Sequence, residues 1–305
     1  RVVPTRCPTR WLIGSRRWAS TEPRGHTVMR NIRLRLAYDG TAFVGWQVQP
    51  NGPSVQSCLE EAIEKLTGTA TRVTAAGRTD SGVHAVGQVA NFTTNSNIPC
   101  SNILSGLQHF LPADIVVVEA DEVAAEFHST YAAVGKWYRY VIHNARPRHP
   151  FLDRYAWQYE ADLDIDAMQE AAQRLIGTHD FRAFETQHPN RATSVRTIRQ
   201  LDVARHGQFS TWSLWPVRDE SPAGDGPFVW IDITADGFLY NMVRAITGTL
   251  VQVGRGRMTA DELTGVLASG TRDDAGETAP ACGLYLMQVE YDESVTPVGM
   301  PNDHS

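Results

Sequence analysis

The amino-acid sequence predicts an α+β protein made of two tandem halves, each with the split βαβ order of strands and helices. Segments with the two-residue period of strands occur in turn with segments of helical period along the chain. The 305 residues, 42% of them hydrophobic and 20% charged, are enough for one large or two medium domains with a well-buried core. We expect each half to form a sheet covered on one face by helices, with the two sheets joined and a ligand cleft between them.

The first half has two predicted helices whose ends are marked by capping and breaking residues. Ser54 can cap the start of the first helix and Gly68 can end it, whereas Pro112 stops the second. Segments with strand periodicity lie around both helices. In chain order, the predicted elements are a strand at 32–38, a helix at 55–66, strands at 72–76 and 83–93, a helix at 102–110 and a strand at 115–120.

The second half has the same kinds of element, with Thr259 as the cap of its last helix and a hydrophilic surface loop at 219–227. Two ferredoxin-like or RRM-like halves are therefore predicted, at 29–125 and 126–292, between a basic leader at 1–28 and a flexible tail at 293–305. The predicted elements are strands at 136–143, 194–205, 229–235 and 284–291, and helices at 165–176, 239–253 and 259–268.

Positive charge is concentrated near the N-terminus. The formal net charge is -6, but the first 30 residues contain seven arginines and one acidic residue, so the rest of the chain carries about -12. A segment rich in Arg, Ser and Thr is typical of an organelle-targeting presequence, so we expect a mitochondrial or other organellar location. A basic tail on a cytoplasmic protein is the alternative interpretation.

Several classes of protein are excluded by composition. No apolar run approaches the roughly 20 residues that a membrane-spanning helix needs. The four cysteines lie far apart without a C-x-x-C pair, which argues against a disulfide framework and a zinc module. No cluster of carboxylates has the spacing of metal ligands, which argues against a metal-dependent nuclease.

The strongest chemical signal is the segment GRTDSGVH at residues 77–84. Gly77 and Gly82 enclose a cation, a hydroxyl and a carboxylate between two predicted strands, and glycine backbone freedom allows those side chains to project into a cleft. The same letters also describe an ordinary turn in which Asp80 bonds its own backbone. The segment by itself leaves both interpretations open.

This loop and five other segments resemble the TruA-type tRNA pseudouridine synthases. Any one match would be weak, but together they follow the order of the family over residues 31–291. The matching segments are AYDGTAFVGWQ at 37–47, GRTDSGVH with GQVANF at 77–92, KWYRY at 136–140, LIGTHDF at 175–181, ADGFLYNMVR at 235–244 and GLYL at 283–286.

The resemblance implies the catalytic residues. Members of the family isomerise uridine to pseudouridine in RNA without a cofactor or metal. Asp80 matches the catalytic carboxylate, and Arg244 matches the arginine that pairs with it, which would hold the aspartate and lower its pKa. Tyr138 matches the tyrosine that stacks on the target base, and its hydroxyl could also take the proton lost from the base carbon.

Further residues are candidates for substrate binding. By the same resemblance, Arg78 fills the space of a flipped nucleotide or holds its phosphate, and Leu284 and Leu286 are apolar walls of the pocket. Arg139 is expected in the lining of the cleft, together with Arg182, Arg191, Arg196 and Arg199, although these arginines could equally form a solvated face. His84 is expected to be structural.

The sequence therefore predicts an active tRNA pseudouridine synthase, acting in the anticodon stem-loop region and forming a homodimer as family members typically do. One residue departs from the pattern: Thr130 stands where the family usually has an arginine that helps to grip RNA. With the acidic body, this departure raises an alternative, a weakly active or inactive synthase fold that serves as a structural subunit of a larger ribonucleoprotein.

Overall fold

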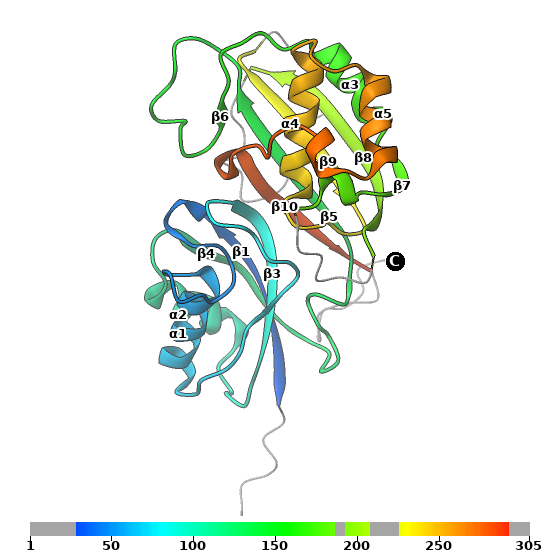
Figure 1. The fold of residues 1–305 in the computed structure, drawn as a ribbon. Helices are drawn as coiled ribbons and strands as arrows, with labels where there is room; N and C mark the ends of the chain where they lie inside the picture. The colour runs from blue at the N-terminus through cyan, green and yellow to red at the C-terminus, as the bar shows by residue number, and fades with distance from the viewer. Residues whose placement is uncertain (1–28, 187–192, 208–225, 293–305) are drawn as a thin grey trace, which may run out of the picture.

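A single mixed sheet of ten strands runs through both halves of the protein in the computed structural model, which describes residues 29–186, 193–207 and 226–292. Figure 1 shows the N-terminal half below and the C-terminal half above, with the helices of each packed on its part of the sheet. The strand order is β4-β1-β3-β10-β5-β9-β8-β7, with β2 beside β3 and β6 beside β5. The predicted α+β class is confirmed.

The N-terminal half contains a four-stranded part of the sheet, in the order β4-β1-β3-β2, and two helices. Strand β1 pairs antiparallel with both β3 and β4. The elements are β1 (Arg30–Tyr38), α1 (Val55–Thr67), β2 (Thr74–Ala75), β3 (His84–Thr94), α2 (Cys100–Phe110) and β4 (Ile115–Val123).

The C-terminal half continues the sheet and carries three helices. Strand β5 pairs antiparallel with β9, and β9 with β8. The elements are β5 (Ala133–His143), β6 (Trp157–Gln158), α3 (Ile165–Gln173), β7 (Gly177–Asp180), β8 (Val195–His206), β9 (Phe228–Ala235), α4 (Met242–Gly254), α5 (Ala260–Ser269) and β10 (Leu284–Tyr291).

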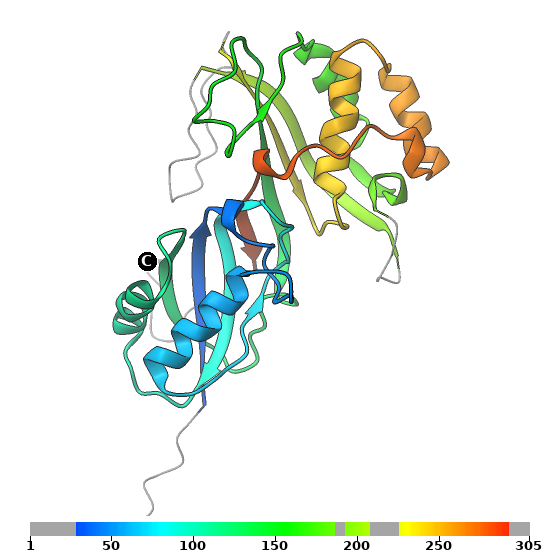
Figure 2. The ribbon, with the colours of Figure 1, turned by 60° about the vertical axis from the view of Figure 1, so that its left-hand side comes forward.

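Strand β10 joins the two halves. It pairs antiparallel with β5 of its own half and parallel with β3, through Tyr285 beside His84 and Leu286 beside Ala85. Strand β10 thus lies in the middle of the molecule, where Figure 2 shows it in red from a second side. Because these hydrogen bonds cross the boundary, the sheets of the two halves form one continuous structure.

The helix ends follow the predicted caps. The Ser54 hydroxyl accepts from the Ser57 N–H at the start of α1, and Gly68 ends that helix with a left-handed φ of 74°. The Thr259 hydroxyl accepts from the Glu262 N–H at the start of α5. The buried faces of α1 to α5 contribute to one main apolar cluster that extends through both halves.

Several element boundaries differ from the prediction, among them those of α4, α3 and β2. Helix α4 begins at Met242 and not at residue 239, because Asn241 takes a left-handed φ of 62° that a helix cannot contain. Helix α3 ends at Gln173, and β7 follows at Gly177, whose φ is 111°. The strand predicted at 72–76 is only two residues long.

Parts of the prediction fall outside the described residues, namely the basic leader at 1–28, the tail from residue 293 and most of the loop at 219–227. Within the described residues, no helix has both the length and the apolar character required to cross a bilayer.

Candidate active site

Two buried polar side chains make hydrogen bonds that hold the loop between β2 and β3. The Tyr38 hydroxyl lies 2.8 Å from the Thr79 hydroxyl, and Gln88 Nε2 donates to the Gly77 carbonyl at 2.8 Å. Burial raises the pKa of Tyr38 to about 12, so its hydroxyl remains protonated. The segment that precedes Asp80 is therefore held in place, while the Asp80 side chain remains 23% exposed.

The segment that follows β1 packs tightly against this loop. The Trp46 N–H donates to the Thr79 carbonyl at 3.0 Å. Gly45 has a φ of 112°, and a Cβ added to it would lie 2.7 Å from the Thr79 oxygen. A Cβ on Gly40 would lie 2.0 Å from the Val83 oxygen, so only glycine fits there. Both glycines lie in the matching segment at 37–47, but their close contact with the loop is seen only in the tertiary structure.

The structure brings Arg244 to Asp80 from the other half of the protein. Arg244 lies in the first turn of α4, and its Nη1 is 3.4 Å from Asp80 Oδ2. The guanidinium is 17% exposed and the carboxylate 23%, so the pair is neither fully buried nor walled off from solvent. A cation in the first turn of a helix is opposed by the helix dipole, which makes a purely stabilising role for Arg244 less favourable.

Two further groups hold the guanidinium of Arg244. Its Nε donates to the Ala279 carbonyl at 2.7 Å, and its Nη1 donates to Asn241 Oδ1 at 2.9 Å. Asn241 Nδ2 in turn donates to the Thr186 hydroxyl at 2.8 Å. Sequence reasoning missed Asn241, Thr186 and Ala279. Only the asparagine carried a signal, because Asn is the residue after glycine that most readily takes a left-handed φ.

Two opposing effects set the pKa of Asp80. Burial is the largest effect and raises the pKa of the carboxyl, while the charge and the hydrogen bond of Arg244 lower it, as predicted for the pair. The net direction is upward from the ordinary value, because burial is the larger of the two effects. The single contact at 3.4 Å is too long to offset the loss of solvation completely.

Tyr138 lies on β5 between Leu286 of β10 and Ile233 of β9. Its ring packs edge to face against Phe238, with 5.0 Å between centroids. Burial, with smaller contributions from Tyr38 and Asp80, raises the pKa of Tyr138 well above its ordinary value. A phenol that stays protonated is a poor general base, so the raised pKa argues against proton abstraction by Tyr138.

The other predicted pocket residues divide into two groups. Leu284 and Leu286 are buried in the same apolar cluster as Tyr138, and their role as walls of a pocket stays a prediction. Arg78 is exposed and, within the described part of the chain, makes no ion pair or hydrogen bond. Its side chain therefore remains available to a ligand.

The prediction for Arg139 is wrong in this structure. Arg139 is 2% exposed, and its guanidinium donates from Nε and Nη2 to both oxygens of Asp232 at 2.9 Å. The guanidinium also lies over the Trp230 ring, 3.9 Å from its centroid. Successive residues of a strand point to opposite faces, so Arg139 points away from the face that carries Tyr138.

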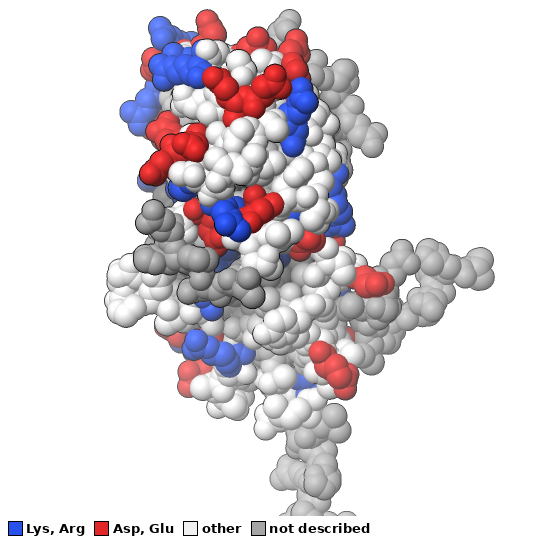
Figure 3. All heavy atoms as spheres, turned by 45° about the vertical axis from the view of Figure 1, so that its right-hand side comes forward, with Lys and Arg blue, Asp and Glu red and all other residues white. Residues whose placement is uncertain are grey.

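Three of the remaining arginines lie in the described residues, and each contacts another group of the protein. Arg182 pairs with Asp180, and Arg199 pairs with Glu290, while Arg196 donates to the Thr193 carbonyl. The predicted Arg191 lies outside the described residues. On the face drawn in Figure 3, basic and acidic side chains lie next to one another and no continuous basic surface appears.

His84 has the structural role expected of it. Its Nδ1 accepts from the Gly40 N–H at 3.1 Å, and its Nε2 lies 2.9 Å from the Arg154 carbonyl. The ring is buried and stacks on Tyr285 with 4.8 Å between centroids. Both nitrogens are therefore used to fix the start of β3 against neighbouring loops.

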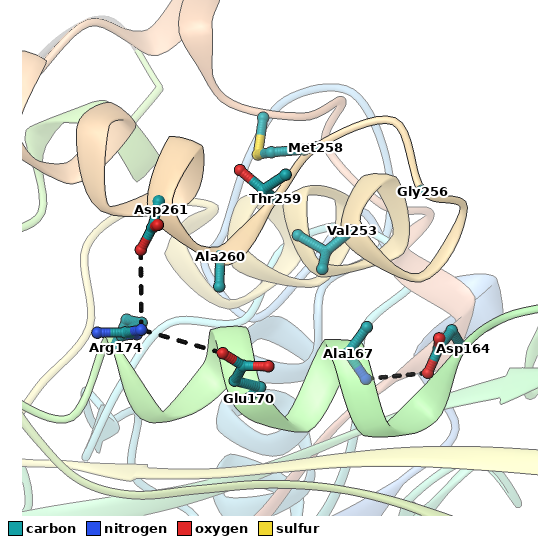
Figure 4. Close-up of a pocket in the computed structure, with 10 residues that line it drawn as sticks. All are labelled: Asp164, Ala167, Glu170, Arg174, Val253, Gly256, Met258, Thr259, Ala260 and Asp261. Carbon is teal, nitrogen blue, oxygen red and sulfur yellow. Dashed lines mark hydrogen bonds and ion pairs between the residues drawn. The ribbon is translucent and has the colours of Figure 1, made fainter.

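Two further observations concern described residues outside this site. In the described ranges, no group of three or more His, Cys, Asp or Glu side chains is arranged to hold a metal ion. A pocket of about 370 Å³ lies between α3, the end of α4 and the start of α5 (Figure 4). Its Arg174 is flanked by Glu170 and Asp261, and none of the predicted site residues lines it.

Comparison with known proteins gives a consistent result. Residues 36–132 and 171–292 match the sequence family described as tRNA pseudouridine synthase. The chain is 43% identical to tRNA pseudouridine synthase A of Pelobacter propionicus over 263 residues, which is 86% of this chain and 100% of that protein. Over the same shares of each chain, it is 44% identical to tRNA pseudouridine synthase A of Acetivibrio thermocellus. The chain belongs to the tRNA pseudouridine synthase family.

Proposed function

We propose that this protein converts uridine to pseudouridine in tRNA, in the anticodon stem-loop region, with Asp80 as the catalytic carboxylate. The observation that carries the proposal is the contact of Asp80 with Arg244, contributed by opposite halves of the chain, in a site that solvent still reaches. The names of its relatives supply the substrate class.

The reaction needs a carboxylate and a surface for the base, but no redox partner. The bond between C1′ of the ribose and N1 of the uracil breaks, the uracil turns, and a bond forms between C1′ and C5. The C5 proton leaves, and N1 takes up a proton. Asp80 either attacks the nucleoside or removes a sugar proton, and both roles require its ionised form.

Each residue contributes to one of these needs. Arg244 keeps part of the Asp80 population ionised and holds its rotamer. The Tyr138 ring supports the detached uracil, which a flat aromatic surface can hold while the base rotates. Leu284 and Leu286 keep water from the site, and Arg78 reaches the flipped nucleotide or its phosphate. No cofactor takes part in this scheme.

The test is chemical mapping of pseudouridine in a tRNA transcript treated with the wild-type protein or with Asp80→Ala. We expect modification at anticodon stem-loop uridines with the wild type and none with the variant. Equal modification by both proteins would refute the assignment of Asp80. Modification confined to another arm of the tRNA would refute the proposed region.

We further propose that the two halves, residues 29–125 and 126–292, are two versions of one split βαβ unit. The strand order β4-β1-β3-β2 of the first half has its counterpart in β10-β5-β9-β8 of the second. The family match also falls into two stretches, one in each half. Under this proposal, the active site lies where the two units meet.

Two properties of the whole protein remain proposals. The Arg-rich residues 1–28 support a mitochondrial location, and a tagged protein lacking them should stay in the cytosol. A homodimer that presents tRNA to two sites is proposed from family resemblance, and light scattering of the purified protein measures its mass. The structural-subunit alternative is not favoured, because the Asp80–Arg244 pair is assembled.

A further inference from the structure

An exposed aromatic pair lies on the segment that leads into β5. The ring of Tyr131 stacks on His128, with 4.3 Å between centroids and 30° between planes. The Tyr131 side chain is 84% exposed, the most exposed of the large apolar residues in the described ranges. A large aromatic ring held open to solvent by a second ring is an arrangement suited to stacking on a ligand.

The backbone beneath this pair is firmly attached to the strand that enters the catalytic loop. The Thr130 hydroxyl donates to the Ala75 carbonyl at 2.6 Å, and the Ser129 hydroxyl donates to the Thr74 carbonyl at 2.7 Å. The Tyr291 hydroxyl donates to the Ser129 carbonyl at 2.8 Å. The pair is therefore a fixed platform and not the tip of a loose loop.

Two independent connections place the platform beside the active site. Ala75, which Thr130 holds, precedes Asp80 by five residues, which span at most about 17 Å of extended chain. The side chain of Lys136, five residues after Tyr131, lies over Gly77, since a Cβ there would be 3.1 Å from its Nζ. At ~3.4 Å per stacked nucleotide, about five nucleotides cover that span.

We propose that the Tyr131–His128 pair stacks on an unpaired base of the substrate RNA a few nucleotides from the modified uridine. Proteins that bind single-stranded or looped RNA commonly stack bases on Tyr and His rings. The inference rests on the proposed function, because it takes tRNA as the ligand. It also accounts for Thr130, whose hydroxyl anchors the platform where the family pattern has an arginine.

The test measures the Kd of an unmodified tRNA transcript for Tyr131→Ala, Tyr131→Phe and the wild type. Loss of one base stack is expected to weaken binding by about tenfold for Tyr131→Ala. Tyr131→Phe keeps the ring and should stay within about twofold of the wild type. The slope of log Kd against log salt should not change, because no phosphate contact is removed.

Phe110 provides the matched control. It is also an exposed aromatic residue beside a histidine, but it ends α2, which packs on β4, at the other end of the order β4-β1-β3-β2 from the strand that the platform contacts. Phe110→Ala should leave the Kd unchanged. His128→Ala, which removes the lower ring, should weaken binding by less than Tyr131→Ala.

Two results would overturn the inference: wild-type affinity for Tyr131→Ala, or equal weakening by Tyr131→Ala and Tyr131→Phe, which would assign the effect to the hydroxyl. The Kd measurement does not depend on catalysis. Failure of the proposed function would appear separately, as a wild-type protein that binds the transcript but forms no pseudouridine.

Discussion

Two pairs of arginine and aspartate in this protein differ in how completely they satisfy each other. Arg139 and Asp232 lie within one half and make two hydrogen bonds of 2.9 Å, and Trp137 Nε1 also donates to Asp232 at 2.8 Å. Arg244 and Asp80 come from different halves and make one long contact of 3.4 Å. The first pair has little capacity left for a ligand, whereas the second retains an exposed carboxylate.

The comparison shows why charge and burial alone do not identify a catalytic pair. Arg139 is the more buried arginine, but its guanidinium already makes two hydrogen bonds to Asp232 and stacks on the Trp230 ring. Arg244 donates from Nε to Ala279 and from Nη1 to both Asn241 and Asp80, and its contact with Asp80 is the longest of the three, which leaves the carboxylate incompletely paired. An incompletely paired carboxylate with a raised pKa is typical of a reactive group.

The largest expected effect on the rate is at the Asp80–Arg244 pair. Asp80→Asn should lower kcat for pseudouridine formation by on the order of 10⁴-fold or more, because the variant has no carboxylate. Its free energy of unfolding should be unchanged or slightly higher, since the raised pKa of Asp80 means that folding disfavours its ionised form at neutral pH. Rate assays and urea unfolding of one preparation measure both quantities. A large loss of stability would make Asp80 structural.

Removing the partner of Asp80 should change the pH dependence. Arg244→Gln is expected to lower kcat/KM by about 10²- to 10³-fold at neutral pH. Asp80 acts ionised, so activity falls as pH falls through its pKa. Because Arg244 lowers that pKa, its removal should move the acid limb of the profile to higher pH. Arg244→Lys should restore part of the wild-type profile. Identical acid limbs would show that the two residues are not coupled.

Mutation of the Arg139–Asp232 pair should lower stability and leave catalysis unchanged. Asp232→Ala leaves the buried Arg139 guanidinium without its carboxylate, and the expected loss of stability is about 3 kcal/mol. Urea unfolding followed by tryptophan fluorescence measures it. The kcat of the folded fraction should stay near the wild-type value. A stable variant with a selective loss of tRNA affinity would return Arg139 to the group of substrate-binding residues.

The smallest effect is expected at the residue that positions Arg244. Asn241→Gly preserves the left-handed φ but removes the oxygen that accepts from Arg244, so kcat should fall by about tenfold with little change in KM. The acid limb should shift slightly toward higher pH, as the guanidinium becomes less well held. An unchanged kcat and pH profile would show that the Ala279 carbonyl alone positions Arg244.

The sequence determined the order of elements, most of their ends and the loop that carries Asp80. Local signals are sufficient for these features: Ser54, Gly68 and Thr259 act through neighbours a few residues away. The start of α4 and the strand β7 were missed, because a left-handed Asn241 and pairing with the distant β8 override the local pattern.

Only the tertiary structure decided which charged side chains remain available to a ligand. Asp80 and Arg244, 164 positions apart in the sequence, are brought together because β10 inserts between β3 and β5 and joins the halves, which no local pattern encodes. Arg139 is not available to a ligand, because alternate residues of β5 point to opposite faces of the sheet and because Asp232 on the neighbouring strand pairs with it. The hydrophobic period of a segment indicates which of its faces is buried. The pKa and the pairing of a side chain depend instead on groups that the fold brings in from elsewhere.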